Sequence, residues 1–181
     1  MACLVLEGDE LRGGASKRKS ITYSLYPKHF TEREQDLFRE SELAYRDCGH
    51  SVKQVRPGQG EDVIVHLTTD NEMRKLYPRL KLTTKLSLTD RGKSPMHIHL
   101  HLDNWLEIPK STGSEYTSLR DYRISLINHE FCHVLGHDHV SCAAPGEESD
   151  VRQQPSRSLG GCIPTTSVVF NPKSPYSSVN F

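Results

Sequence analysis

An α/β or α+β fold with two unequal lobes is predicted by two features of this 181-residue chain. Up to residue 139, segments with strand alternation and segments with helical spacing follow in the order strand, helix, strand, strand, strand, helix. From residue 140 onward, proline, glycine and serine dominate and neither period is sustained. We therefore expect a flexible arm over residues 1–19 and a single domain over 20–181, with an N-terminal lobe (20–139) and a small irregular C-terminal lobe (140–181).

The first half of the N-terminal lobe predicts a strand, a helix and a second strand. The stretch "ITYSLYP" (21–27) alternates apolar and polar side chains and ends at a proline, which is typical of a strand. Thr31 and Glu34 have the spacing of a capping box, so a helix is expected to begin there and to end at Gly49. The apolar, β-branched run "EDVIVHLTT" (61–69) follows a turn and predicts a strand in the centre of the sheet.

The second half of this lobe predicts a short helix, two extended segments and a long helix. "NEMRKLYPRL" (71–80) has helical character until its proline ends it. Residues 85–105 predict two extended segments around the turn "DRGKSP". Residues 117–137 predict the long helix, begun by a second capping box from Ser118 and Asp121.

Charge and hydropathy narrow the classes of partner. The chain has 23 basic and 23 acidic residues, whereas a nucleic-acid-binding surface needs a basic excess. It has no apolar run of about 18 residues, which a membrane-spanning helix requires, and no basic region typical of a signal peptide at its N-terminus. We therefore expect no nucleic-acid or membrane partner, and an intracellular location or export by a non-classical route. The oligomeric state stays open.

The five cysteines admit two interpretations. Their number is odd and no C-x-x-C pair occurs, which favours free thiols in a reducing compartment. The alternative is a disulfide between Cys142 and Cys162, which would stabilise a C-terminal segment poor in apolar residues. The sequence does not decide between the two.

The stretch "LINHEFCHVLGHDHVSC" (126–142) has the spacing of a zinc site. His129 and His133 are four residues apart, so on a helix both imidazoles leave the same face and can chelate one ion. Glu130 is offset around the helix, where a general base would reach a water molecule. Gly136 lets the chain leave the helix abruptly, so that His139 can return as a third ligand. Three protein ligands leave a fourth position open, which is typical of a catalytic zinc site.

The motif "HEFCHVLGHDH" resembles the long zinc motif H-E-x-x-H-x-x-G-x-x-H of the metzincin metalloproteases. More narrowly, "YRISLINHEFCHVLGHDHVSC…QQ…LGGC" resembles a little-characterised metallopeptidase-like family known mainly from actinobacteria. The resemblance implies a zincin-like N-terminal lobe, with a mixed twisted sheet and an active-site helix. It also implies a Zn²⁺-dependent endopeptidase of protein or peptide substrates, with His129, His133 and His139 as metal ligands and Glu130 as the base. The substrate is then expected to pair with an edge strand around residues 95–103.

One departure from the metzincin pattern concerns the floor of the site. Metzincins place a methionine beneath the zinc after the third histidine, but here all three methionines lie upstream and "DVRQQ" offers Arg152 instead. We expect this charged side chain to point away from the metal. The missing methionine keeps two alternatives open: an inactive zinc-binding module, and a zinc hydrolase of a non-peptide amide or ester.

Several residues near the motif have other candidate roles. His137 competes with His139 as third ligand, but the family spacing favours His139. Asp138 is either an acceptor for a ligand imidazole or an exposed loop acid. Cys132 is expected to be a buried thiol and Tyr122 to be a packing residue, while Tyr176 is a candidate donor to a developing oxyanion.

The strand "MHIHLHLD" (96–103) carries a second histidine group. Alternation places His97, His99 and His101 on one side of the strand. This side is a second candidate metal site, or a surface that contacts a peptide in the substrate cleft.

Overall fold

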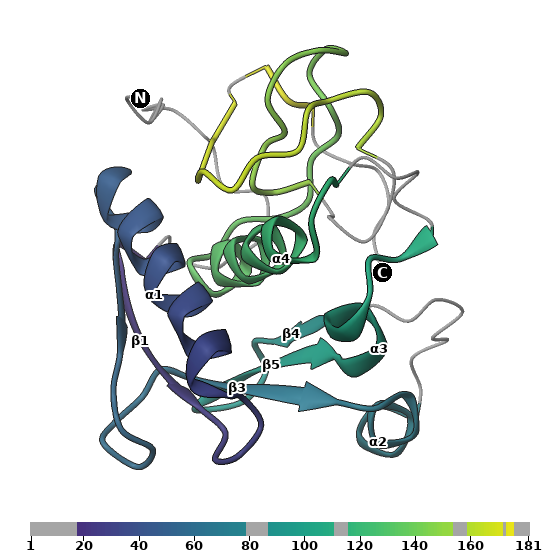
Figure 1. Cartoon of the computed structure of the whole chain (residues 1–181). Helices are drawn as coiled ribbons and strands as arrows, with labels where there is room; N and C mark the ends of the chain where they lie inside the picture. The colour runs from purple at the N-terminus through teal and green to yellow at the C-terminus, as the bar shows by residue number, and fades with distance from the viewer. Residues whose placement is uncertain (1–17, 79–86, 111–115, 154–158, 172, 176–181) are drawn as a thin grey trace.

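A five-stranded mixed sheet forms the centre of the fold, in the order β2-β1-β3-β5-β4 (Figure 1). The computed structural model describes residues 18–78, 87–110, 116–153, 159–171 and 173–175. Four strands run parallel, and β4 is antiparallel to β5. The strands are β1 (Ser20–Leu25), β2 (Ser51–Gln54), β3 (Val63–Thr68), β4 (Leu88–Asp90) and β5 (Met96–His101).

Side chains cap the free amide groups at the starts of α1, α2 and α4, whereas α3 has no side-chain cap. Thr31 and Thr69 each form a capping box with the glutamate three residues later, at the starts of α1 and α2. Ser118 accepts a hydrogen bond from the backbone of Asp121 at the start of α4. The helices are α1 (Glu32–Asp47), α2 (Asp70–Leu76), α3 (Leu102–Leu106) and α4 (Leu119–Val134). None of the described helices is long and apolar enough to cross a membrane.

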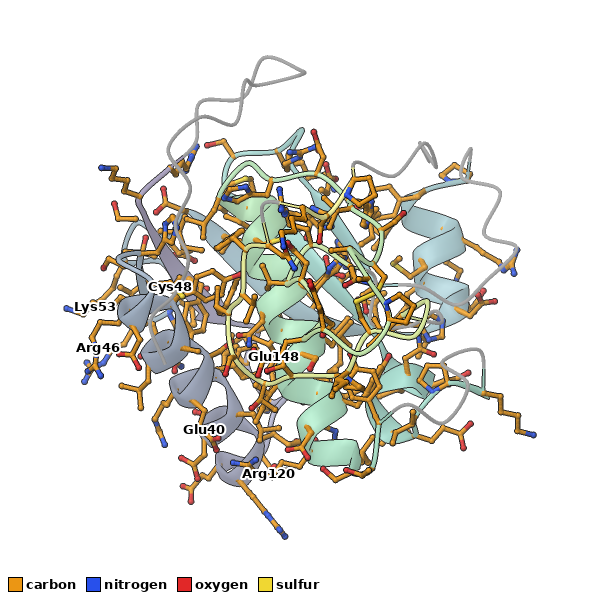
Figure 2. All side chains as sticks on the ribbon, turned by 90° about the horizontal axis from the view of Figure 1, so that it is seen from above. Glu40, Arg46, Cys48, Lys53, Arg120 and Glu148 are labelled. Atoms are coloured by element: carbon orange, nitrogen blue, oxygen red, sulfur yellow. A yellow bond between two sulfur atoms is a disulfide. The ribbon has the colours of Figure 1, made fainter. Side chains whose placement is uncertain are left out.

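The helices α1 and α4 lie side by side over one face of the sheet (Figures 1 and 2). Aromatic side chains join the layers: the ring of Tyr23 from β1 lies 5.0 Å from that of Phe131 of α4, and Phe38 of α1 packs against both. At the outer edge of the helix pair, Arg120 forms an ion pair with Glu40. Because burial of these large rings is favourable only in one arrangement of the layers, α4 is fixed relative to the sheet.

A buried polar contact sets the register of the two helices. The Ser41 hydroxyl donates to the side-chain oxygen of Asn128, and the Tyr45 hydroxyl donates to the Asn128 carbonyl oxygen. Asn128 precedes the histidine motif directly, so this contact also fixes the first turn of that motif. Breaking it would leave buried polar groups without partners.

The irregular segment that follows α4 covers the side of this helix away from the sheet (Figure 1). A disulfide joins Cys142 to Cys162, whose Cα atoms are 5.8 Å apart. The alternative interpretation, a disulfide between these two residues, is therefore confirmed. The favoured interpretation of free thiols is wrong for them. Cys48 is also disulfide-bonded, while Cys132 is a free buried thiol, as predicted.

The coarse fold prediction, a mixture of helices around a mixed sheet, is confirmed. The strands predicted at 21–27 and 61–69 and the two long helices are present within a few residues of their predicted bounds. The strand β2 and the five-residue helix α3 were not predicted, because such short segments show no measurable period. The predicted arm (1–19) lies almost wholly outside the described residues.

The edge-strand prediction for residues 95–103 is wrong. The strand β5 (Met96–His101) lies between β3 and β4, with both of its sides paired, and three residues of β4 form the described edge. The turn "DRGKSP" folds β4 back along β5 and so covers the side that we expected to be open.

Candidate metal centre

Three imidazoles converge at the end of α4. His129, His133 and His139 each offer one ring nitrogen, and these three nitrogens lie within 4.8 Å of one another. Among the described residues, no other group of three or more His, Cys, Asp or Glu side chains has this spacing. The Nε2 atom of His133 lies 3.1 Å from that of His129 and 3.2 Å from that of His139. The structure therefore brings together the three residues that the motif selects.

The chain returns to the helix through a glycine turn. Gly136 has a φ of 100°, and the backbone amide of His137 donates to the Cys132 carbonyl at 3.0 Å. This is the hydrogen-bond pattern of a Schellman motif, which ends a helix where only glycine adopts the left-handed conformation easily. The turn reverses the chain, so His139 approaches the two helical histidines from outside the helix.

Two backbone carbonyl groups orient the helical histidines. The Nδ1 atom of His129 lies 3.0 Å from the Val151 carbonyl oxygen, and Nδ1 of His133 lies 2.8 Å from that of His137. A carbonyl oxygen can only accept, so each Nδ1 carries the proton and each Nε2 keeps its lone pair. Of the two roles that the sequence left open for Asp138, the exposed loop acid is confirmed: it is exposed and pairs with Arg91 at 3.2 Å.

Burial keeps these imidazoles neutral. The His129 side chain is 2% exposed, and burial, together with the neighbouring His133 and His139, holds its pKa well below the ordinary value. Burial and His139 lower the pKa of His133 to about 3. Both rings are therefore in the neutral form that binds a metal ion.

The carboxyl group of Glu130 is buried on the same helix and faces the edge strand. Glu130 is 3% exposed, and burial raises its pKa to about 7, against a lowering contribution from a hydrogen bond. The donor of that bond is the hydroxyl of Thr89 in β4, 2.5 Å from Oε2. Sequence reasoning missed Thr89, although alternation along β4 places it on the face of the sheet that packs against α4.

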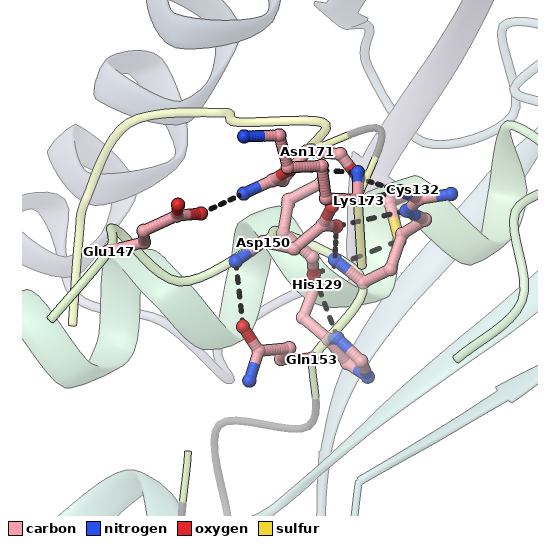
Figure 3. Close-up of polar contacts among 9 residues, drawn as sticks. His129, Cys132, Glu147, Asp150, Gln153, Asn171 and Lys173 are labelled. Atoms are coloured by element: carbon pink, nitrogen blue, oxygen red, sulfur yellow. Dashed lines mark hydrogen bonds and ion pairs between the residues drawn. The ribbon is translucent and has the colours of Figure 1, made fainter. Parts of the chain in front are cut away.

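A buried ion pair holds the segment behind His129 (Figure 3). Arg152 is 4% exposed, and its Nε and Nη2 atoms bind the two carboxylate oxygens of Asp150 at 2.9 Å each. The Arg152 guanidinium also donates to the backbone carbonyl oxygen of Asn171 at 3.0 Å, and the backbone amide of Asn171 donates to the Asp150 carboxylate at 2.6 Å. These contacts direct Arg152 to the C-terminal segment, while the carbonyl of Val151 reaches His129.

The remaining sequence candidates fall outside the cluster. His137 contributes its backbone carbonyl, and its ring packs 4.6 Å from that of Phe170. Cys132 is fully buried, and Tyr122 is buried against Tyr116, so both are packing residues as predicted. Tyr176 lies outside the described residues.

The β5 histidines lie on the far face of the sheet. Ile98, which alternates with His97 and His99, belongs to the core beneath the helices and pairs with Thr89, the residue that contacts Glu130. His97 and His99 therefore point away from the three-histidine cluster. The expectation that they contact a peptide in the same cleft is wrong.

Comparison with known proteins places the site within a family. The chain matches the family described as protein of unknown function (DUF3152) over residues 34–162, a range that contains most of α1, all of α4 and all three clustered histidines. No curated protein matches the chain. The chain belongs to the DUF3152 family.

Proposed function

We propose that this member of the DUF3152 family is a zinc-dependent endopeptidase with a zincin-like N-terminal lobe. The observation that carries the proposal is the convergence of His129, His133 and His139, with Glu130 buried beside the first of them. The motif that places these residues resembles that of the metzincins.

The donor set fits a zinc ion. Ligand nitrogens at about 2.0–2.1 Å from a tetrahedral ion lie about 3.3–3.4 Å apart. The Nε2 separations of 3.1 and 3.2 Å are close to this spacing. Both helical rings present a lone pair at Nε2, because a backbone carbonyl holds the proton at Nδ1. Three imidazole nitrogens with one position left open suit zinc in a hydrolytic role.

Glu130 would act as the base and then as the acid. A zinc ion at the three histidines would supply Lewis acidity toward the scissile carbonyl and would acidify a water molecule. The Glu130 carboxylate takes the proton of the attacking water and returns it to the leaving amine. The Thr89 hydroxyl holds one carboxylate oxygen, and in this proposal the second oxygen would accept the proton of the water.

The corrected sheet order moves the expected substrate contact to β4. This strand (Leu88–Asp90) is the described edge of the sheet, and its middle residue touches Glu130. An extended peptide that pairs with the free side of β4 would run past the carboxylate. Protein or peptide substrates therefore remain the favoured partners.

The residue that replaces the metzincin methionine would be Val151. Its side chain is buried and its carbonyl accepts from His129. The adjacent Asp150–Arg152 pair fixes this backbone, so an apolar side chain and a carbonyl, rather than a methionine, support the ligand.

The disulfides favour an oxidising compartment for this activity. Cys142 and Cys162 are joined and Cys48 is also bonded, and such bonds persist mainly outside the reducing cytosol. We therefore replace the intracellular expectation with a location in an oxidising compartment.

The proposal is tested by metal analysis and by turnover of a peptide library, alongside a panel of small acylated amides and esters. The zinc-loaded protein should cleave peptides, and Glu130→Gln should bind zinc equally but lose turnover. Cleavage of the small acylated substrates alone would indicate a non-peptide hydrolase. Zinc binding without turnover of either panel would indicate an inactive module.

A further inference from the structure

A second group of histidines forms a stack on the outer face of the sheet. His66 of β3 pairs in register with His99 of β5, and His97 lies two residues before His99 on the same face. Their ring centroids are 5.0–5.8 Å apart, and the planes differ by only 10–14°. The three rings belong to two adjacent strands of the central sheet, so their spacing is set by backbone pairing.

Two nitrogens of this stack are at chelating distance. The Nε2 atom of His66 lies 2.9 Å from Nδ1 of His97. Two ligands at right angles, each about 2.0–2.1 Å from an ion, lie about 2.9 Å apart. The pair is therefore spaced for adjacent positions of a tetragonal or octahedral ion, and is narrower than the 3.1 and 3.2 Å separations in the α4 cluster.

A buried, unsatisfied nitrogen lies in the same stack. His99 is 4% exposed, and among the described residues its Nε2 has no hydrogen-bond partner. Its Nδ1 lies 3.0 Å from the Thr68 hydroxyl. A buried polar atom without a partner is costly and is often explained by a missing ion or water.

The electrostatic surroundings leave the stack neutral. Burial, followed by the neighbouring histidines, lowers the pKa of His66 to about 3, and burial and His97 lower that of His99 to about 4. The nearby ammonium group of Lys93 is paired with Asp90 at 3.3 Å. Neutral imidazoles offer lone pairs, and His66 and His97 are only half-buried, so an ion could reach them from solvent.

We propose that His66 and His97 form a second metal site, which binds a divalent ion that favours tetragonal or octahedral nitrogen and oxygen ligands, such as Ni²⁺ or Cu²⁺. The ion binds Nε2 of His66 and Nδ1 of His97, and each ring keeps its proton on its other nitrogen. Water fills the remaining positions, and the ring of His99 packs 5.0 Å from that of His66 and 5.8 Å from that of His97. Among the described His, Cys, Asp and Glu residues, no group of three besides the α4 cluster has its ligand atoms within 4.8 Å of one another, so we assign two protein ligands to this site.

Nickel titration of the zinc-loaded protein tests the site. We expect one equivalent of Ni²⁺ to bind while the zinc content, measured on the same samples, stays at one per chain. His66→Gln and His97→Gln should each abolish nickel binding and retain zinc. The matched control His50→Gln removes a histidine outside both groups and should retain both metals.

The outcomes separate this site from the proposed catalytic one. Failure of the zinc-loaded wild type to bind nickel, or retention of nickel by both variants, would overturn the second site without affecting the first. With Cu²⁺ as probe, electron paramagnetic resonance should show two imidazole nitrogens in the wild type. A spectrum without imidazole nitrogens would also overturn the proposal, and it does not depend on how either variant folds.

Discussion

The hydroxyl of Thr89 lies 2.5 Å from Oε2 of Glu130, and it joins the edge strand β4 to the buried carboxylate of α4. The same hydroxyl also lies 3.4 Å from the backbone carbonyl oxygen of Glu130, so one side chain of the strand contacts the helix at both groups. If Glu130 is the base, the residue that orients it belongs to the same strand that would bind the substrate.

Thr89→Val should therefore lower kcat and leave KM nearly unchanged. A hydrogen bond to a charged group contributes about 1.5–3 kcal/mol, which corresponds to a fall in kcat of about 10- to 100-fold. Steady-state kinetics on a cleaved peptide measures the effect. Thr89→Ser keeps the hydroxyl and should restore most of the rate; equal losses in the Val and Ser variants would show that the hydroxyl does not position Glu130.

Asp150→Asn should destabilise the protein and weaken zinc binding. The substitution leaves the Arg152 guanidinium buried without its counter-charge, which costs about 3–5 kcal/mol. The Val151 carbonyl then loses its fixed position, so zinc affinity should fall by about 10-fold. Urea unfolding and competitive zinc titration measure the two effects.

Glu147→Gln is the matched control for that variant. Glu147 accepts from the side chain of Asn171 in the same segment, but it is not fully buried. Its replacement should cost no more than about 1 kcal/mol and should leave zinc affinity unchanged. If both variants behave alike, the buried ion pair has no special role in holding Val151.

Reduction of the Cys142–Cys162 disulfide should lower the free energy of unfolding by about 3 kcal/mol, the value expected for a loop of this length. The double variant Cys142→Ser/Cys162→Ser should show this loss without reductant, and reductant should then affect it only through the disulfide of Cys48. Cys132→Ala, which removes the free thiol, should keep the wild-type response to reductant. A double variant as stable as the oxidised wild type would contradict this role of the disulfide.

The outer histidine stack should make the metal-free protein less stable in acid. Burial and His97 lower the folded-state pKa of His99 to about 4, so between that pH and the unfolded value of about 6.5 the unfolded chain binds more protons. This contribution is fully present above about pH 6.5 and is lost as the pH falls toward 4, with a slope of up to about 1.4 kcal/mol per pH unit.

Urea unfolding in the presence of a chelator, at several pH values, measures that slope. His99→Gln removes the titrating ring, which contacts Thr68, Tyr77 and His97. The free energy of unfolding of this variant should therefore depend less steeply on pH than that of the wild type. Identical slopes would show that His99 is not the group that titrates.

The three-histidine cluster could be predicted from the sequence because a helix fixes the spacing of His129 and His133, and because Gly136 marks the turn that returns His139. The partners of the imidazoles could not be predicted. Two of them are backbone carbonyl groups, one from Val151, and a backbone carbonyl has no sequence signature.

The sheet edge was mispredicted for a different reason. The extended segments on both sides of the turn "DRGKSP" were predicted, but the order of strands in a sheet is set by long-range pairing, so β5 was expected to be the edge and the position of Thr89 at the site was missed. Only the β5 members of the histidine stack could be predicted from alternation along the strand. His66 joins them through pairing between β3 and β5, which is a long-range contact that the sequence does not show.

The zinc content of His139→Gln compared with His137→Gln shows whether the three histidines at the end of α4 hold a metal ion. Both residues lie in the same turn, but only the His139 ring faces the other two histidines, whereas His137 serves through its backbone carbonyl. We expect one tightly bound zinc ion per chain in the wild type and in His137→Gln, and a loss of zinc in His139→Gln. A wild-type protein that neither copurifies with zinc nor binds added zinc, or a His139→Gln variant that keeps it, would contradict the account.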